Sequence, residues 1–199
     1  GGVRDLDWLI DPSIGSSSQE TNTLGYYIQS GLDYAGKYIA DVVMRTDGSS
    51  RFGENERWHN YGRAAASWRM AQEDWWPVEP LTEFKLRYAI GIAGNAPGFT
   101  NQYEVWSASG GLPNKSTLGN PNLKPERTIE QEMGIDMILN NKYQLHLTYA
   151  KQPTSDQIIQ MTLPATSGYP ARFENAGEIT GTTLEATLEA QIVNRPNFS

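Results

Sequence analysis

The ten residues "FKLRYAIGIA" (Phe84–Ala93) alternate between two kinds of side chain at every position. Large apolar side chains stand at the even positions, and charged or small ones stand at the odd positions. Successive side chains of a β-strand point to opposite faces, so this period of two predicts a strand with one apolar and one polar face. Strands of soluble proteins are usually about 5–6 residues long. A run of this length instead suits a tilted membrane-spanning strand, which needs about 9–11 residues.

Six further runs show the same alternation with varying clarity. They cover residues 24–34, 37–45, 62–70, 128–137, 143–149 and 183–192. Together with residues 84–93 they predict an all-β fold: an antiparallel, up-and-down sheet of about seven long strands.

The links between these runs alternate in length. Short or moderate links lie at Ala35-Gly36, at residues 71–82 and at Asn140-Asn141, whereas residues 47–58, 95–127 and 152–181 form long ones. Successive links of an antiparallel sheet lie at opposite ends, so all the long links share one end. Outer-membrane barrels have this asymmetry, with short periplasmic turns and long extracellular loops. Seven strands are too few for a wide barrel with a charged interior, so the prediction is an arc of a larger transmembrane β-barrel.

The first long link, "DGSSRFGENERW" (Asp47–Trp58), is too polar and too rich in glycine for a regular element. We interpret it as a hairpin at the extracellular rim. Its charged side chains are expected to pair with one another or with neighbouring loops.

Aromatic side chains gather around the short links. Such clustering at one height is typical of the girdle of a membrane barrel, although ordinary core and turn aromatics would give a similar pattern. The residues concerned are Tyr34, Tyr38, Trp68, Trp75, Trp76, Phe84 and Tyr143.

Composition excludes several classes of function. The 199 residues carry a net charge of −7 and no cysteine, which argues against a nucleic-acid partner and excludes thiolate chemistry. No run of about 18 apolar residues could form a membrane-spanning helix. His59 and His146 stand alone in the sequence, and no phosphate-binding or nucleophile motif is present. We therefore expect no metal, no cofactor and no catalytic residue.

The charged positions of the strands are interpreted as a polar wall facing the lumen of the barrel. Glu130 and Glu132 lie two residues apart on one strand face, about 7 Å by strand rise, and a pair of carboxylates could hydrolyse a glycoside. Opposite charges on neighbouring strands favour the plainer reading, a ladder of lumenal ion pairs. The lumen-facing set is Arg63, Arg69, Lys85, Arg87, Glu130, Glu132, Glu185 and Glu189.

The loop of residues 95–127 is the best candidate for ligand binding. Phe99, Tyr103 and Trp106 stand there among amides and hydroxyls, a mixture that suits recognition of a sugar or a peptide. A loop of this length without structure of its own is usually functional or disordered. Simple packing on neighbouring segments is the alternative.

Four segments, in order, resemble the SusC/RagA family of TonB-dependent outer-membrane receptors. They are "RTDGSSRFGENERWHNYGRAAASWRMAQEDW" (Arg45–Trp75), "LTEFKLRYAIGIAGN" (Leu81–Asn95), "LGNPNLKPERTIEQEMGIDM" (Leu118–Met137) and "LPATSGYPARFENAGEITGTTLEATL" (Leu163–Leu188). The chain departs from the family at Gly62, where Pro is frequent, and at Ala93, where Thr is usual.

The resemblance implies a 22-stranded barrel with an amino-terminal plug, of which residues 1–199 would form one partial barrel domain. It implies import of a large nutrient, a glycan or a peptide, driven by TonB and assisted by a SusD-like surface lipoprotein. The location implied is the lipid of the outer membrane of a Gram-negative, Bacteroidota-like cell. No plug, TonB-contacting segment, signal peptide or terminal strand is seen in the sequence. A soluble β-sandwich that binds carbohydrate is the alternative.

Overall fold

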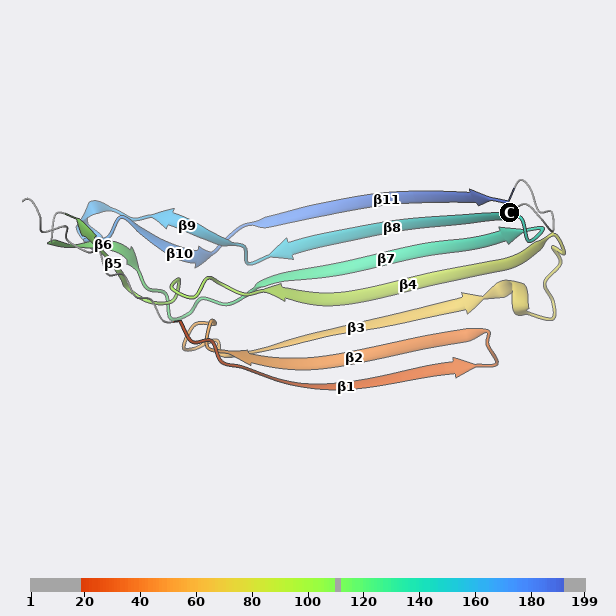
Figure 1. Cartoon of the computed structure of the whole chain (residues 1–199), viewed down its shortest axis with the longest axis horizontal. Helices are drawn as coiled ribbons and strands as arrows, with labels where there is room; N and C mark the ends of the chain where they lie inside the picture. Colours follow the sequence, from red (N-terminus) through yellow and green to blue (C-terminus); the bar gives the residue numbers. More distant parts are fainter. Residues whose placement is uncertain (1–18, 110–111, 192–199) are drawn as a thin grey trace, which may run out of the picture.

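The computed structural model describes residues 19–109 and 112–191 of the chain. Its main body is a single seven-stranded sheet in the order β1-β2-β3-β4-β7-β8-β11, with every neighbouring pair antiparallel (Figure 1). These strands are β1 (Thr23–Tyr34), β2 (Tyr38–Ser49), β3 (Trp58–Arg69), β4 (Leu81–Asn95), β7 (Glu126–Leu139), β8 (Tyr143–Ser155) and β11 (Glu178–Ala190). The seven predicted long strands are confirmed. The last predicted run ends at residue 192, which lies outside the described residues.

The sheet has the two chemically different faces that the alternation predicts. The register aligns Leu86, Tyr88 and Ile90 of β4 with Ile135, Met133 and Gln131 of β7, and similar rows cross the whole sheet. Large apolar side chains of this face are exposed, for example Ile28 at 69% and Leu184 at 78%. No second layer of the described residues covers them, so the face-to-face sandwich considered above is wrong.

All the short links lie at one end of the sheet and all the long ones at the other (Figure 1). The tight turns use left-handed backbone, with φ of 56° and 66° at Ala35 and Gly36 and of 53° and 55° at Asn140 and Asn141. Two consecutive residues of positive φ match the right-handed twist of a hairpin. The third short link contains the 3-10 helix η1 (Met70–Gln72). This arrangement confirms the predicted alternation of link lengths.

The first long link is shorter than the sequence suggests. Strand β2 continues through Asp47 and Gly48 to Ser49, which pairs with Thr23, and β3 already begins at Trp58. Gly48 lies directly opposite Trp58, whose ring would be 2.9 Å from a β-carbon at that position. A glycine in a strand often marks such a close approach, and here it leaves room for the indole.

The two longer links are not structureless, which corrects the expectation for residues 95–127. They build a second sheet of order β5-β6-β10-β9, at the long-link end of the molecule (Figure 1). Its strands are β5 (Val105–Ser109), β6 (Leu112–Leu118), β9 (Ile158–Thr162) and β10 (Ala171–Asn175), with the 3-10 helix η2 (Ala165–Ser167) between the last two. Strands β6 and β10 run parallel, so this sheet joins the two links.

The seven-stranded sheet is open, with β1 and β11 at its two edges. None of the helices in the described part of the chain has the length and apolar composition needed to cross a membrane.

Candidate functional site

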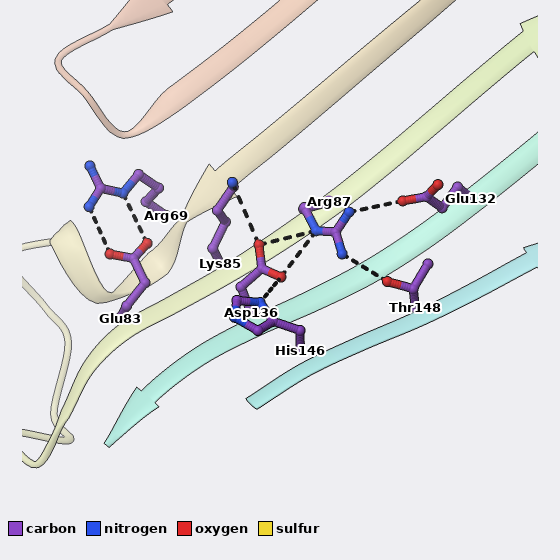
Figure 2. Close-up of polar contacts among 8 residues, drawn as sticks. All are labelled: Arg69, Glu83, Lys85, Arg87, Glu132, Asp136, His146 and Thr148. Carbon is purple, nitrogen blue, oxygen red and sulfur yellow. Dashed lines mark hydrogen bonds and ion pairs between the residues drawn. The ribbon is translucent and has the colours of Figure 1, made fainter. Parts of the chain in front are cut away.

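The polar face of the sheet carries a connected network centred on Arg87 (Figure 2). Its guanidinium donates to Asp136 (3.2 Å), Glu132 (2.9 Å) and the hydroxyl of Thr148 (2.9 Å). Gly134 lies directly opposite Arg87 and would bring a β-carbon to 2.5 Å from the guanidinium. The missing side chain therefore provides the space in which Arg87 reaches three partners on two strands.

Asp136 is the second centre of this network. Besides Arg87, the carboxylate contacts the Lys85 ammonium at 3.6 Å and the Nδ1 of His146 at 3.0 Å. Arg69 forms a separate two-pronged pair with Glu83, at 2.9 and 2.7 Å. A fork-to-fork arginine–carboxylate pair fixes geometry as well as charge, so β3, β4, β7 and β8 are held in one arrangement.

By register, the eight positions interpreted as lumen-facing all lie on this polar face. Within the described residues, Arg87 and Glu132 are the only two of the eight that form an ion pair with each other. Arg63 binds Asp41, Arg87 binds Glu132, and Glu130 accepts a 2.6 Å hydrogen bond from Gln152. Most carboxylate partners of the cations, namely Asp41, Glu83 and Asp136, were absent from the predicted set. Alternation identified the face but did not identify the partners across strands.

The three long links meet in a compact rim. The backbone of Gly53 donates to Leu123 (2.7 Å) and that of Asn55 to Pro121 (3.1 Å). Phe52 is 5% exposed and Leu123 is completely buried. A β-carbon at Gly53 would lie only 2.7 Å from the nitrogen of Leu123. The loop of residues 50–57 is therefore seated on residues 120–125.

Arginines of the first link bind backbone carbonyls of their own link and of a neighbouring loop, as expected for this rim hairpin. Arg57 donates to Ser50 and Phe52 at 2.8 and 2.9 Å, while Arg51 reaches Pro97 at 3.0 Å. A guanidinium offers five donors in a fixed fork, which suits a loop whose carbonyls have no strand partner. These bonds close the first link on itself and fasten it to the second.

The third link joins the same rim through Asn175. Its amide donates to the carbonyls of Lys124 (2.8 Å) and Asp156 (2.9 Å), and its oxygen accepts from the Lys124 nitrogen (3.0 Å). The Lys124 ammonium pairs with the carboxylate of Asp156 at 3.2 Å. One amide side chain thus connects the end of β10 to Lys124, just before β7, and to Asp156, just after β8.

The three aromatic candidates of the loop do not form one cluster. Phe99 and Tyr103 pack together with ring centroids 6.0 Å apart. Trp106 instead meets Tyr169 edge to face at 6.5 Å, on the small sheet. Tyr103 and Trp106 are about half exposed. Tyr169 was not predicted, since nothing in its local sequence reveals that the third link packs beside β5.

At the opposite end, the aromatic rings form a continuous chain around Glu73, a residue that no sequence pattern singled out. Ring contacts run from Tyr34 through Tyr38, Trp68, Trp75 and Trp76 to Phe84. The Glu73 carboxylate accepts from the Tyr38 hydroxyl (2.6 Å), the Trp68 indole (2.9 Å) and Lys37 (3.2 Å). Amphipathic rings at one height, with their polar ends held, have the form of an interfacial girdle.

Comparison with known proteins explains this combination of an exposed apolar face, a girdle and a polar network. The family model described as "TonB dependent receptor-like, beta-barrel" matches residues 4–199. The chain belongs to the TonB-dependent receptor family. The predicted resemblance is confirmed, and the open sheet is an arc of the TonB-dependent receptor barrel.

Relatives within this TonB-dependent receptor family come from Bacteroidota. The chain is 29% identical over 177 residues to TonB-dependent receptor P26 of Formosa agariphila, covering 83% of the chain and 18% of the relative. It is 25% identical over 195 residues to TonB-dependent receptor SusC of Bacteroides thetaiotaomicron, covering 89% and 19%. The chain therefore spans about a fifth of the length of these receptors.

Solved structures of a peptide importer and of a siderophore receptor share the fold. The RagAB peptide importer in its "open-open" state superposes with a TM-score of 0.80 at 21% identity, over 89% of this chain and 20% of that one. The siderophore receptor PirA of Acinetobacter baumannii gives a TM-score of 0.65 at 17% identity, over 86% and 26%. At such identities the likeness concerns the barrel alone.

Proposed function

We propose that the chain forms part of the wall and extracellular rim of a receptor that imports a large nutrient, a glycan or a peptide, across the outer membrane. The observation that carries this proposal is the exposed apolar face bounded by the aromatic chain from Tyr34 to Phe84. Soluble monomers rarely expose large continuous apolar patches, which mark interaction or membrane surfaces. On the strands of a membrane barrel, an apolar face of this kind contacts lipid.

Each part of the molecule then has a role in uptake. The polar face, with Arg87 and Asp136 at its centre, lines the lumen and keeps the strands in register. The rim around Leu123 fixes the long links. The aromatic residues that contact the nutrient are Trp106 on the small sheet and Phe99 and Tyr103 in the segment that precedes β5. Transport energy comes from TonB acting on the full-length parent, and a SusD-like lipoprotein covers the rim from outside.

One structural neighbour bears on the nutrient. SusC is among the relatives of the chain, and the structural neighbour RagAB is described as a peptide transporter.

Glu130 and Glu132 serve as polar wall residues rather than as a hydrolytic pair. Glu130 is hydrogen-bonded to Gln152, and Glu132 is hydrogen-bonded to Arg87. The role proposed is transport without catalysis.

The test uses the full-length parent in its own cells. Fractionation is expected to recover it in the outer membrane, released only by detergent, and its deletion is expected to abolish uptake of one class of labelled oligosaccharide or peptide. Recovery as a soluble protein would contradict the membrane assignment. Unchanged uptake of every labelled oligosaccharide and peptide in the deletion strain would contradict the transport role.

A further inference from the structure

One cation of the small sheet is held by aromatic rings rather than by a carboxylate. Lys115 and Trp106 are direct partners in the register of β5 and β6. The Lys115 ammonium lies 5.6 Å from the centroid of the Trp106 ring and 4.4 Å from that of Tyr169. Both distances lie within the roughly 6 Å over which a ring attracts a cation.

The charge of Lys115 is not neutralised by a neighbour. Other cations near the rim have partners: Lys124 pairs with Asp156 and Arg172 with Glu174. Within residues 19–109 and 112–191, no carboxylate forms an ion pair with Lys115. Glu104, which precedes β5, instead accepts a hydrogen bond from the Tyr169 hydroxyl.

This hydrogen bond fixes the cluster. Tyr169 is only 9% exposed and comes from the third link, whereas Glu104 belongs to the second. The two links are thus joined beneath Lys115. Trp106, by contrast, is 50% exposed, so a large part of its indole remains open beside a fixed positive charge.

An ammonium has three N–H donors, and ring faces attract its charge without using those donors in ordinary hydrogen bonds. The cluster therefore combines a flat apolar platform with an available cationic donor. A pyranose ring offers a C–H face of matching size, and a carboxylate or sulfate at its edge would complement the ammonium. An acidic peptide side chain offers the charge but no flat apolar face to cover the indole.

We propose that Trp106, Lys115 and Tyr169 form a subsite for an acidic sugar residue, one that carries a carboxylate or a sulfate. The sugar ring stacks on Trp106, and Lys115 binds the anionic group and selects for it. Tyr169, with Glu104, positions Lys115. This inference rests on the proposed role of the parent in nutrient uptake and names the chemical class of the nutrient.

The test measures binding to the purified full-length receptor by isothermal titration calorimetry. The probes are four-residue oligosaccharides of galacturonate, of sulfated galactose and of neutral galactose, together with a tetra-aspartate peptide. At least one acidic sugar is expected to bind about tenfold more tightly than the neutral one, the size of effect that one charged hydrogen bond supplies. Higher salt is expected to reduce this preference, since exposed charges are screened.

Variants separate charge from platform. Lys115→Gln is expected to remove the preference for the acidic sugar and Lys115→Arg to keep it. Trp106→Ala is expected to weaken binding of acidic and neutral sugars alike. Lys142→Gln, which removes a charge from the turn at the opposite end of the sheet, serves as the matched control and is expected to change nothing.

Three results would overturn the inference: no acidic sugar bound more tightly than the neutral one, an unchanged preference in Lys115→Gln, or tighter binding of tetra-aspartate. Failure here is separable from failure of the proposed function. The receptor could reside in the outer membrane and take up a nutrient without any preference for negative charge. That result would contradict only the proposed subsite. If the full-length parent were found outside the outer membrane, the transport role would be contradicted, whichever sugar it binds.

Discussion

The hydroxyl of Tyr38 donates a 2.6 Å hydrogen bond to the carboxylate of Glu73, which lies 35 residues further along the chain. The same carboxylate accepts from Trp68 and Lys37. One residue of the β3–β4 link therefore holds the polar ends of the girdle on β2 and β3. The aromatic rings are consequently fixed at the end of the sheet that carries the short turns.

Replacing Glu73 by Gln is expected to lower the melting temperature of the full-length receptor in detergent. Gln keeps an acceptor oxygen but loses the charge that favours Lys37, and its amide cannot accept from three donors equally well. Asp74→Asn is the matched control, because Asp74 is fully exposed and lies 3.7 Å from the same ammonium. An equal fall in melting temperature for both variants would contradict the central role of Glu73.

This effect depends on pH with a definite sign. Hydrogen bonds from Tyr38 and Trp68, and then the Lys37 charge, lower the pKa of Glu73 below its ordinary 4.5. The hydrogen bond to Glu73 raises the pKa of Lys37 above 10.5. The Glu73 contribution is thus complete above pH 4.5 and is lost as the pH falls through the lowered pKa. The Lys37 contribution is complete below pH 10.5 and is lost as the pH rises through the raised pKa. Melting curves of wild type and Glu73→Gln should differ most between these limits and converge in acid.

Gly53→Ala is expected to loosen the rim. The added β-carbon would lie 2.7 Å from the Leu123 nitrogen, and overpacking of this kind costs about 1–3 kcal/mol. Hydrogen exchange of the full-length receptor should show faster exchange in residues 50–57 and 120–125. Glu54→Ala, at the neighbouring exposed position, should leave exchange unchanged. Equal protection in the two variants would show that the loop is not seated as described.

Arg87→Gln is expected to destabilise the barrel by about 1–3 kcal/mol, because two carboxylates would lose a charged hydrogen-bond donor. Arg63→Gln removes a single ion pair from a side chain that is 60% exposed, for which about 0–1 kcal/mol is expected. Urea unfolding of the full-length receptor in detergent measures both losses. A larger loss for Arg63→Gln would contradict the assignment of Arg87 as the centre of the polar face.

The long strands were predictable because each has its own pattern. In β4 the contrast between Tyr88 or Ile90 and Arg87 follows directly from the two faces of a sheet in a barrel wall. The turns were predictable for a local reason as well, since Gly36 and the pair Asn140-Asn141 tolerate positive φ.

The small sheet was not predictable from its strands. β5 and β6 are short and alternate weakly, and Pro113 lies within β6. They are defined by pairing with each other, and β6 pairs also with β10. Contacts such as Gly53 with Leu123, Asn175 with Lys124 and Glu73 with Tyr38 join distant parts of the chain. No local sequence pattern encodes these long-range contacts. They depend on which links the strand topology brings together at one end of the sheet.

The face of Ile90 is expected to meet lipid and that of Ala89 to meet water, and this can be tested at these two adjacent positions. These 199 residues contain no cysteine, so Ala89→Cys and Ile90→Cys are made in the full-length receptor with any cysteine outside this segment replaced by Ser, and the protein is reconstituted in vesicles. The measurement is the rate of labelling by a charged, water-soluble maleimide. A barrel wall with these two faces predicts rapid labelling at position 89 and protection at position 90 that is lost on unfolding. Equal labelling at both positions, or protection at 89 with labelling at 90, would contradict it.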